Sequence, residues 1–263
     1  MYYFVLEQPK NRWQASFQNK IVAALEDLQI IGEIAKANPI QKPEDLCLMG
    51  LKKGYTTIVV IGSDTMINNL SAIIAKKGAT LGIIPMDEKS SFYGLIGANN
   101  WEEATQALPK RRVETFDLGR VAVDRFFLTY VNVVSSSRKK ISQVIIQFKD
   151  YQIEVPAKNI TITNGALDTV NSQIIKNSFS DGIIDIYIST QLSRENNSFL
   201  SSIFNKTDKP YYSSVFHAKK IKIFGKEEIL DIVAPDGKIL IKTPAEISIV
   251  PNIVKIIIKK AEL

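Results

Sequence analysis

The segment from Val59 to Leu70, VVIGSDTMINNL, carries the residues whose types and spacing best suit chemistry. An apolar run typical of a buried strand leads into Gly62, Ser63 and Asp64, and apolar residues at helical spacing follow. Such a turn presents backbone N–H groups and a helix N-terminus, which suit phosphate oxygens. The carboxylate of Asp64 can hold a metal ion or a ribose, and it can equally be the N-cap of the helix. On the residues alone, both interpretations stay open.

The composition limits what other chemistry the chain can perform. Its 263 residues are 45% hydrophobic and 23% charged, which predicts a globular protein with one large or two ordinary domains. The net charge of +6 is too small to indicate nucleic acid as a partner. A single cysteine, Cys47, and a single histidine, His217, exclude a disulfide framework and a zinc site built from Cys and His clusters. Carboxylates, hydroxyl groups and lysines must therefore do any chemistry.

Two hydrophobic patterns divide the chain, and we expect a domain boundary between residues 115 and 116. Residues 1–115 alternate short apolar runs, such as Thr57–Ile61 and Leu81–Pro85, with segments of helical period. This pattern predicts an α/β domain with a parallel sheet and with ligands beyond the carboxyl ends of its strands. Residues 116–263 alternate with period two, as in Val144–Phe148, and predict an antiparallel β-sandwich whose last strand can return to the first domain.

Three polar segments have both a functional and a plain structural interpretation. Residues Ser135–Lys140 (SSSRKK) fit a basic linker or a solvated hairpin, and Gln191–Ser214 fits a mobile loop. Lys219, Lys220 and Lys222 fit a membrane-facing patch or the solvated face of a strand. Because no window approaches the roughly 18 apolar residues of a membrane span, we expect a cytoplasmic protein that can touch the inner face of the membrane.

The order of these motifs resembles the diacylglycerol kinase catalytic-domain family. That family includes bacterial lipid kinases and sphingosine kinases, and it shares its nucleotide-binding fold with NAD kinases. The resemblance spans nearly the whole chain and depends on order and spacing more than on identity. The family turn GGDGTxNE is matched here at Gly62, Asp64 and Asn68, while Ser63 and Thr65 replace glycines. The resemblance thus implies nucleotide binding by these five residues.

A second family signature, IPxGTGNDFAxxLG, corresponds to Ile84–Gly97, IPMDEKSSFYGLIG. The structural residues at its ends are retained, but its nucleotide-contacting centre has become Asp87–Ser91. The resemblance places Glu88 at the nucleotide. Two carboxylates beside a triphosphate would repel it unless a metal ion or Lys89 compensates.

The remaining family positions fall on four charged residues. In FDLGRV, Asp117 occupies the position that contributes to the active-site cleft and would orient the acceptor. In SDGIIDI, Asp181 and Asp185 match an element that binds magnesium in some bacterial members, and a turn with paired aspartates is the plain alternative. In APDGK, Lys238 replaces the glutamate that serves as proton acceptor, and it could contact phosphate instead.

Taken together, the resemblance implies phosphoryl transfer, dependent on ATP and Mg²⁺, to the hydroxyl group of a diacylglycerol-like lipid. Asp64, Asp117 and Lys238 would be the catalytic residues. The lost motif residues favour an alternative, a catalytically inactive relative that binds a nucleotide, a lipid headgroup or a protein partner. A weaker third hypothesis is phosphorylation of a soluble acceptor, as the fold shared with NAD kinases permits. A homodimer formed through sheet edges is compatible with the resemblance.

Overall fold

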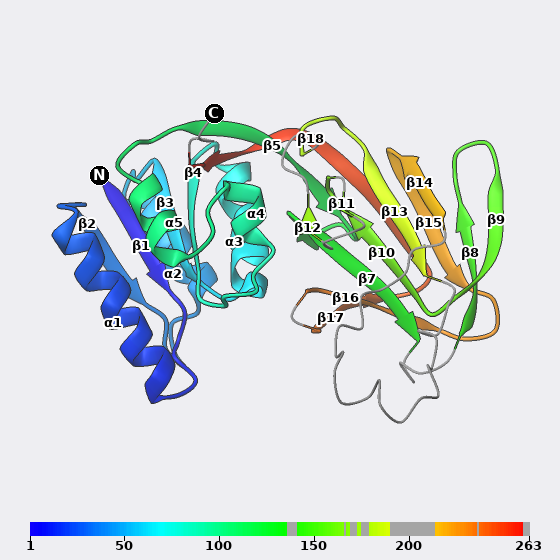
Figure 1. Cartoon of the computed structure of the whole chain (residues 1–263), viewed down its shortest axis with the longest axis horizontal. Helices are drawn as coiled ribbons and strands as arrows, with labels where there is room; N and C mark the ends of the chain where they lie inside the picture. Colours follow the sequence, from blue (N-terminus) through cyan, green and yellow to red (C-terminus); the bar gives the residue numbers. More distant parts are fainter. Residues whose placement is uncertain are drawn as a thin grey trace, which may run out of the picture.

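The computed structural model describes residues 1–135, 141–165, 167–168, 173–174, 179–189, 214–235 and 237–259. The expectations for residues 136–140 and for the loop at 191–213 lie outside the described residues. Figure 1 shows two lobes, a helix-covered sheet that contains the N-terminus and a lobe built of strands.

The first lobe is built on four parallel strands in the order β2-β1-β3-β4. Their bounds are β1 (Tyr2–Leu6), β2 (Gly32–Lys36), β3 (Thr57–Gly62) and β4 (Thr80–Pro85). Every residue of β1 and β3 is buried, as expected for central strands with both faces covered. In contrast, β2 lies at the edge and is only half-buried.

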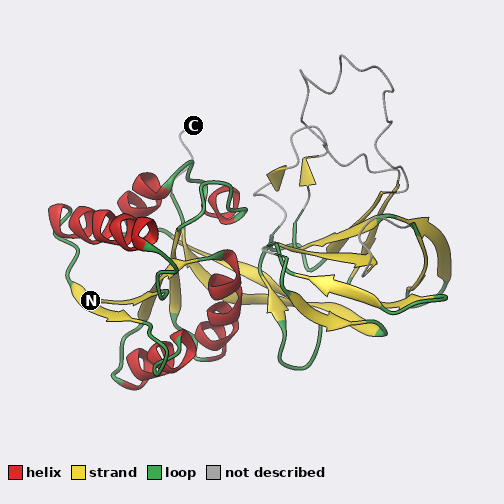
Figure 2. Ribbon diagram, turned by 90° about the horizontal axis from the view of Figure 1, so that it is seen from below, coloured by secondary structure: helices red, strands yellow, loops and turns green. Residues whose placement is uncertain are grey.

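Helices cover both faces of this sheet, as Figure 2 shows. Helix α1 (Arg12–Asp27) contacts α5 (Trp101–Ala107), α2 (Pro43–Lys52) contacts α3 (Asp64–Lys76), and the short α4 (Phe92–Ile96) contacts β4. Helix α1 shows why these segments are helical: the Asn11 side chain caps its N-terminus, and Ile21 and Leu25 are buried one turn apart. None of the helices in the described part of the chain is long and apolar enough to cross a membrane.

The second lobe packs two antiparallel layers around an aliphatic core. One layer has the order β14-β13-β10-β7-β16-β17. Its strands are β7 (Tyr130–Ser135), β10 (Asn159–Thr163), β13 (Ile184–Ser189), β14 (Ser214–Ala218), β16 (Leu230–Val233) and β17 (Ile239–Lys242). The other layer contains β8 (Ser142–Gln147), β9 (Gln152–Ala157) and β15 (Lys220–Gly225). The short β11 (Leu167–Asp168) and β12 (Gln173–Ile174) pair only with each other. The predicted fold class, a parallel α/β domain followed by an antiparallel β-sandwich, is confirmed.

A single long strand, β18 (Ala245–Ile257), belongs to both lobes (Figure 1). Its first residues pair with β15, and its last residues pair in parallel with β4. Strand β5 (Val113–Arg120) runs antiparallel along it and leads to the short β6 (Phe126–Phe127). The ladder is interrupted by a bulge between Val250 and Val254, where Asn252 has a left-handed φ of 51°.

The fully buried carboxylate of Asp117 on β5 fastens this bulge. Its Oδ1 accepts a hydrogen bond from the backbone N–H of Asn252 at 2.7 Å, and its Oδ2 accepts one from Gly182 at 2.7 Å. The backbone of Asp117 adds two contacts, from its N–H to the carbonyl of Phe179 at 2.8 Å and from the Asn164 side chain to its carbonyl at 2.8 Å. Asp117 therefore joins β5, β18 and the segment before β13.

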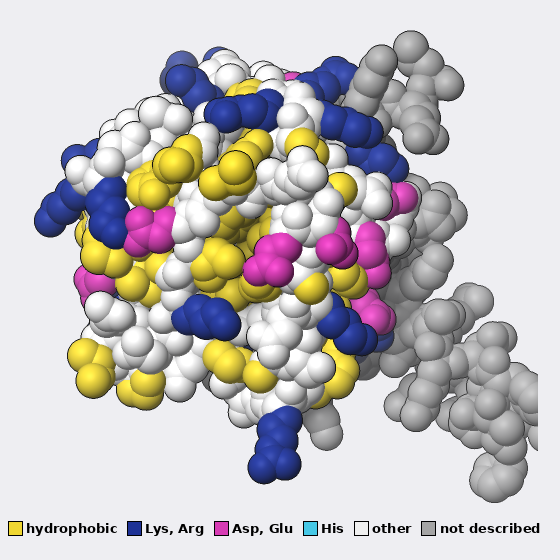
Figure 3. Space-filling model, turned by 90° about the vertical axis from the view of Figure 1, so that its left-hand side faces the viewer, with side chains coloured by type: hydrophobic (Ala, Val, Ile, Leu, Met, Phe, Trp, Pro, Cys, Tyr) yellow, Lys and Arg dark blue, Asp and Glu magenta, His cyan; other side chains and the backbone are white. Residues whose placement is uncertain are grey.

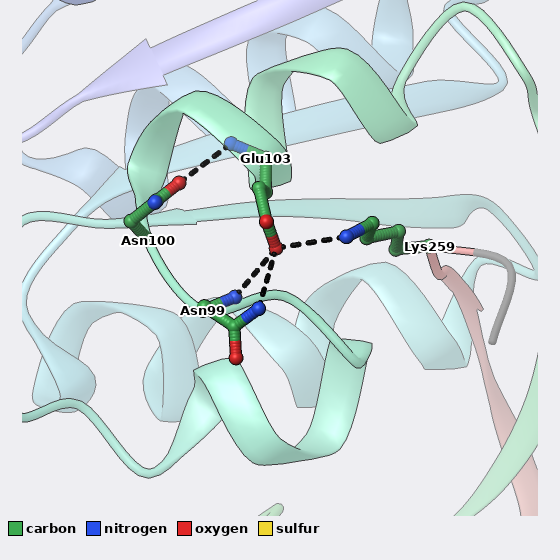
Figure 4. A network of polar contacts seen from close by, with 4 residues as sticks. All are labelled: Asn99, Asn100, Glu103 and Lys259. Atoms are coloured by element: carbon green, nitrogen blue, oxygen red, sulfur yellow. Dashed lines mark hydrogen bonds and ion pairs between the residues drawn. The ribbon is translucent and has the colours of Figure 1, made fainter. Parts of the chain in front are cut away.

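The end of β18 is tied to the first lobe by a polar network, drawn in Figure 4. Lys259 Nζ lies 3.0 Å from Glu103 Oε2 on α5, and Asn99 donates to the same oxygen from its backbone at 2.9 Å and from its side chain at 3.0 Å. The Asn100 side chain caps α5 by accepting from the Glu103 N–H at 2.9 Å. Lys259 and Asn99 hold the pKa of Glu103 below its ordinary value.

In the described part of the chain, strand β2 pairs only with β1 and leaves an open sheet edge at the far end of the first lobe. Figure 3 views this end and shows hydrophobic side chains gathered around a hollow. The apolar side chains exposed at or near this edge include Leu28, Ile31 and Ile34. Unpaired N–H and C=O groups beside apolar side chains make such an edge suited to pairing with another chain.

We predict that Asp117→Ala lowers the free energy of unfolding by about 3 kcal/mol, because two buried backbone N–H groups lose their acceptor. Urea denaturation of the full chain measures this change. Asp124→Ala, which alters an exposed aspartate close to β5, is the control and should change the stability little. Equal stabilities of the two variants would contradict the stabilising role of the Asp117 hydrogen bonds.

Glu103→Gln should lower the melting temperature at neutral pH but not in acid. The lowered pKa of Glu103 means that the folded state favours its charged form, so its contribution is present above the ordinary value of 4.5 and is lost as pH falls through the folded pKa. Melting curves of both proteins at pH 7 and at about pH 3.5 measure the difference. A difference in melting temperature between the two proteins that persists unchanged in acid would show that the charge of Glu103 contributes nothing to stability.

Candidate functional site

The turn between β3 and α3 lies at the carboxyl edge of the parallel sheet, where the sequence predicted ligands. Gly62 ends β3 and is paired with Pro85 at the end of β4. A Cβ atom at Gly62 would lie 2.7 Å from Met66 Sδ and 3.1 Å from a carboxylate oxygen of Glu7. A larger residue here would therefore have to displace the side chains of Met66 and Glu7.

Glu7 fills the place that the sequence assigned to a phosphate. It follows β1, the strand next to β3, and its carboxylate accepts from the Ser63 backbone N–H at 2.6 Å and from Ser63 Oγ at 2.8 Å. Ser63 is also the N-cap of α3, because its Oγ accepts from the Met66 N–H at 3.5 Å. The alternative that Asp64 is the N-cap is therefore wrong.

Asp64 is the first residue of α3 and is surrounded by hydroxyl groups. Although its side chain is charged, Asp64 is only 8% exposed. Oδ1 accepts from Ser90 Oγ at 2.5 Å, Oδ2 lies 3.4 Å from Ser91 Oγ, and Ser91 Oγ lies 3.0 Å from Thr129 Oγ1. Burial raises the pKa of Asp64, and the hydrogen bond from Ser90 opposes this shift. Three hydroxyl groups and one carboxylate thus converge where the two lobes meet.

Asn68 lies one turn further along α3 and connects it to the second lobe. Its Oδ1 accepts from the Leu128 N–H at 2.8 Å, but its buried Nδ2 has no hydrogen-bond partner among the described residues. Asn164 donates to the Leu128 carbonyl at 2.9 Å, and within the same part of the chain its buried Oδ1 likewise lacks a partner. Buried polar atoms without partners are costly, so this junction has hydrogen-bonding capacity that a water molecule or a ligand could use.

Two further residues with predicted nucleotide contacts differ in exposure. Thr65 is buried on the first turn of α3, whereas Glu88 is exposed in the loop after β4. Next to Glu88, the Asp87 carboxylate accepts from the Lys89 N–H at 2.9 Å. The structure therefore gathers Gly62, Ser63, Asp64, Thr65 and Asn68 in one turn and helix, and it leaves Glu88 on the surface.

The predicted metal residues lie in the second lobe. Asp181 Oδ1 accepts from the Ile183 N–H at 2.9 Å, and Asp185 Oδ1 lies 2.6 Å from His217 Nδ1. Burial raises the pKa of Asp181, and the charges of Asp185 and Asp117 raise it further. Within the described ranges, no three His, Cys, Asp or Glu side chains group in a way that could hold a metal ion. The magnesium site at Asp181 and Asp185 therefore stays a prediction.

Lys238 and Asp117 differ from Asp64 in exposure and in hydrogen-bond partners. Lys238 is exposed on the turn between β16 and β17, where its carbonyl accepts from the Ala234 N–H at 2.8 Å. Both carboxylate oxygens of Asp117 accept backbone hydrogen bonds, so its side chain has a structural role in this state.

A groove of about 680 Å³ adjoins the carboxyl ends of β1 and β2. It is lined by residues 7–10, 37–39, 42 and 43, which include Glu7, Lys10 and Lys42. One lining residue, Glu7, also contacts Ser63, the N-cap of α3. A ligand with phosphates near Lys10 and Lys42 could fit this arrangement.

Sequence reasoning missed Glu7, and it gave no individual role to Ser90, Ser91 or Thr129. The two serines carried a usable signal, because they follow β4, and parallel neighbours such as β3 and β4 end at the same edge. Nothing in the sequence places the end of β1 beside the end of β3.

No protein-family model and no curated protein match this chain. Solved structures do match it. A diacylglycerol kinase from Bacillus anthracis has a TM-score of 0.73 and 21% sequence identity, with coverage of 100% of this chain and 98% of that chain. An NAD kinase from Archaeoglobus fulgidus in complex with ATP has a TM-score of 0.56 and 17% identity, with coverage of 98% and 93%. The chain therefore has the diacylglycerol kinase and NAD kinase type of fold, in which a parallel α/β domain is joined to a β-sandwich.

Proposed function

We propose that this chain is a diverged relative of the diacylglycerol kinases, which binds ATP at the carboxyl edge of its parallel sheet and transfers a phosphoryl group to a lipid hydroxyl. The observation that carries the proposal is the buried Asp64 carboxylate at the start of α3, on the same helix as Asn68, whose Nδ2 has no partner among the residues that the structure describes. A helix N-terminus and unused donors suit phosphate oxygens. The similarity in fold to a diacylglycerol kinase and to an ATP-bound NAD kinase supports the same proposal.

Each residue would have a distinct role in this reaction. Asp64 would organise the nucleotide, with Gly62, Ser63, Thr65 and Asn68 around its phosphates. Asp117 would act as a positioning residue, since it holds together the segments that meet at the junction. A lysine ammonium group has no lone pair with which to accept a proton, so Lys238 would contact phosphate rather than act as a base.

Magnesium would supply charge neutralisation on the transferred phosphate. Since the described residues hold no complete metal site, the ion would enter with ATP. Asp181 and Asp185 would provide supporting carboxylates only.

The second candidate function is binding without catalysis, and the Glu7 contact favours it. The Glu7 carboxylate occupies the Ser63 N–H that would face a phosphate. The replacement of the family's proton acceptor by Lys238 points the same way. In this case the fold would bind a nucleotide, a lipid headgroup or a protein partner and transfer nothing.

The proposed partners would contact the protein in different ways. A lipid acceptor requires the protein to reach a membrane from its cytoplasmic side. A second copy of the chain would find the open β2 edge, with Leu28, Ile31 and Ile34, available for pairing.

We predict that Asp64→Asn weakens ATP binding at least about tenfold and removes its dependence on Mg²⁺, because a carboxylate near metal-bound phosphates is worth more than about 1.4 kcal/mol. Titration calorimetry of the full chain with ATP, with and without Mg²⁺, measures this. Asp27→Asn, at the exposed end of α1, is the matched control. Unchanged affinity in Asp64→Asn, or no binding by the wild type at millimolar ATP, would overturn the proposed site.

Glu7→Gln should strengthen ATP binding about tenfold, since the amide oxygen can still accept one hydrogen bond from Ser63 while the repulsion of the triphosphate disappears. The same calorimetric titration measures the gain, and Glu26→Gln on α1 serves as the control for loss of one negative charge. Radiolabel transfer from ATP to diacylglycerol vesicles then separates the two candidate functions. Tighter ATP binding without transfer would identify a non-catalytic relative, and equal affinities of both variants would show that Glu7 does not compete with phosphate.

A further inference from the structure

A second groove, of about 610 Å³, opens in the β-sandwich. It lies between the β8–β9 hairpin, residues 147–151, and the segment that joins β14 to β15, residues 217–222. Strands β9 and β14 are the edge strands of their two layers, so the groove is the mouth of the sandwich on this side. It belongs entirely to the second lobe and shares no residue with the site around Asp64.

The groove has an aromatic and aliphatic lining. The ring of Phe148 stacks on Tyr151 with centroids 4.6 Å apart and planes 14° apart, and it lies 5.8 Å from the ring of Phe216. Phe148 and Ile221 are buried, while Tyr151 is 54% exposed at the hairpin tip. An incoming apolar group would therefore find the continuation of the sandwich core behind Phe148.

Four exposed lysines surround this apolar lining: Lys149, Lys219, Lys220 and Lys222. Lys220 Nζ pairs with Glu246 at 2.8 Å, and the same glutamate lies opposite Lys222 in the β15–β18 ladder and attracts its charge. Lys149 and Lys219 have no hydrogen-bond or ion-pair partner for their side chains in the part of the chain that the structure describes. Among the described residues, Asp150 is the one acidic residue in the lining of the groove. The rim therefore carries a net positive charge and has unused donors.

His217 lies in the lining of this groove, and its Nδ1 is 2.6 Å from a carboxylate oxygen of the buried Asp185. Apolar lining and a cationic rim complement a ligand with an anionic head and an apolar body. An inorganic anion would leave the aromatic lining unused, and a neutral lipid would leave the lysines unused.

We propose that this groove binds one anionic phospholipid of a bilayer, with the lipid phosphate at Lys149, Lys219 and Lys222 and the start of an acyl chain against Phe148 and Tyr151. The volume suits a headgroup and part of a chain, which is a typical size for a ligand site. The inference does not depend on the proposed kinase activity, because binding here needs neither ATP nor Asp64.

The test is sedimentation of the full chain in the absence of ATP with two kinds of vesicle. One kind contains phosphatidylcholine alone, and the other contains equal parts of phosphatidylcholine and phosphatidylglycerol. We expect binding to the anionic vesicles only. Lys149→Glu combined with Lys219→Glu should weaken it at least about 30-fold, the contribution expected of two membrane-facing lysines. Tyr151→Ser should weaken it by a smaller factor while leaving the charge unchanged.

The matched control combines Lys20→Glu with Lys52→Glu, which changes the charge equally on exposed lysines of α1 and α2. Retained vesicle binding in this control supports the groove, and an equal loss would show unspecific attraction and overturn it. A water-soluble short-chain phosphatidylglycerol should compete with vesicles. Competition by inorganic phosphate at the same concentration would instead assign the lysines to a small anion and would overturn the lipid proposal.

Discussion

Strand β18 imposes the constraint on which the two-lobed structure depends. One end pairs with β15 in the sandwich and the other with β4 in the parallel sheet, so the lobes cannot separate without breaking a hydrogen-bonded ladder. The bulge at Asn252 lets the strand change course, and Asp117 satisfies the N–H group exposed there. The position of the second lobe beside α3, and hence the composition of the junction, follows from this arrangement.

At the junction, groups from separate segments meet at the start of α3. Asp64 comes from α3, Ser90 and Ser91 precede α4, and Thr129 precedes β7. Asn68 holds the Leu128 backbone in place, and this contact keeps Thr129 close to Ser91. The site is therefore polar, largely buried and shared between the lobes, which is the setting in which a bound phosphate would contact both.

The fold could be predicted from the sequence because its signals are local. The all-apolar run at Thr57–Ile61 fits a central strand, and the period-two segments of the second half fit a sandwich. The turn at Gly62 could likewise be predicted. The contact of Glu7 with Ser63 could not be predicted, because it depends on the order of the strands in the sheet. Strand β1 lies next to β3 in the sheet, although β2 separates the two strands in the sequence. The pairing of Asp185 with His217 depends on the β13–β14 register and was hidden for the same reason.

The central claim is that a nucleotide binds at the carboxyl edge of the parallel sheet. Hydrogen–deuterium exchange of the full chain, with and without millimolar ATP and Mg²⁺, locates binding along the backbone directly. Binding at this edge should slow exchange at residues 62–68 and 87–91 and leave exchange in the sandwich around Lys219 unchanged. Exchange that stays the same at both segments, or protection confined to the second lobe, would contradict it.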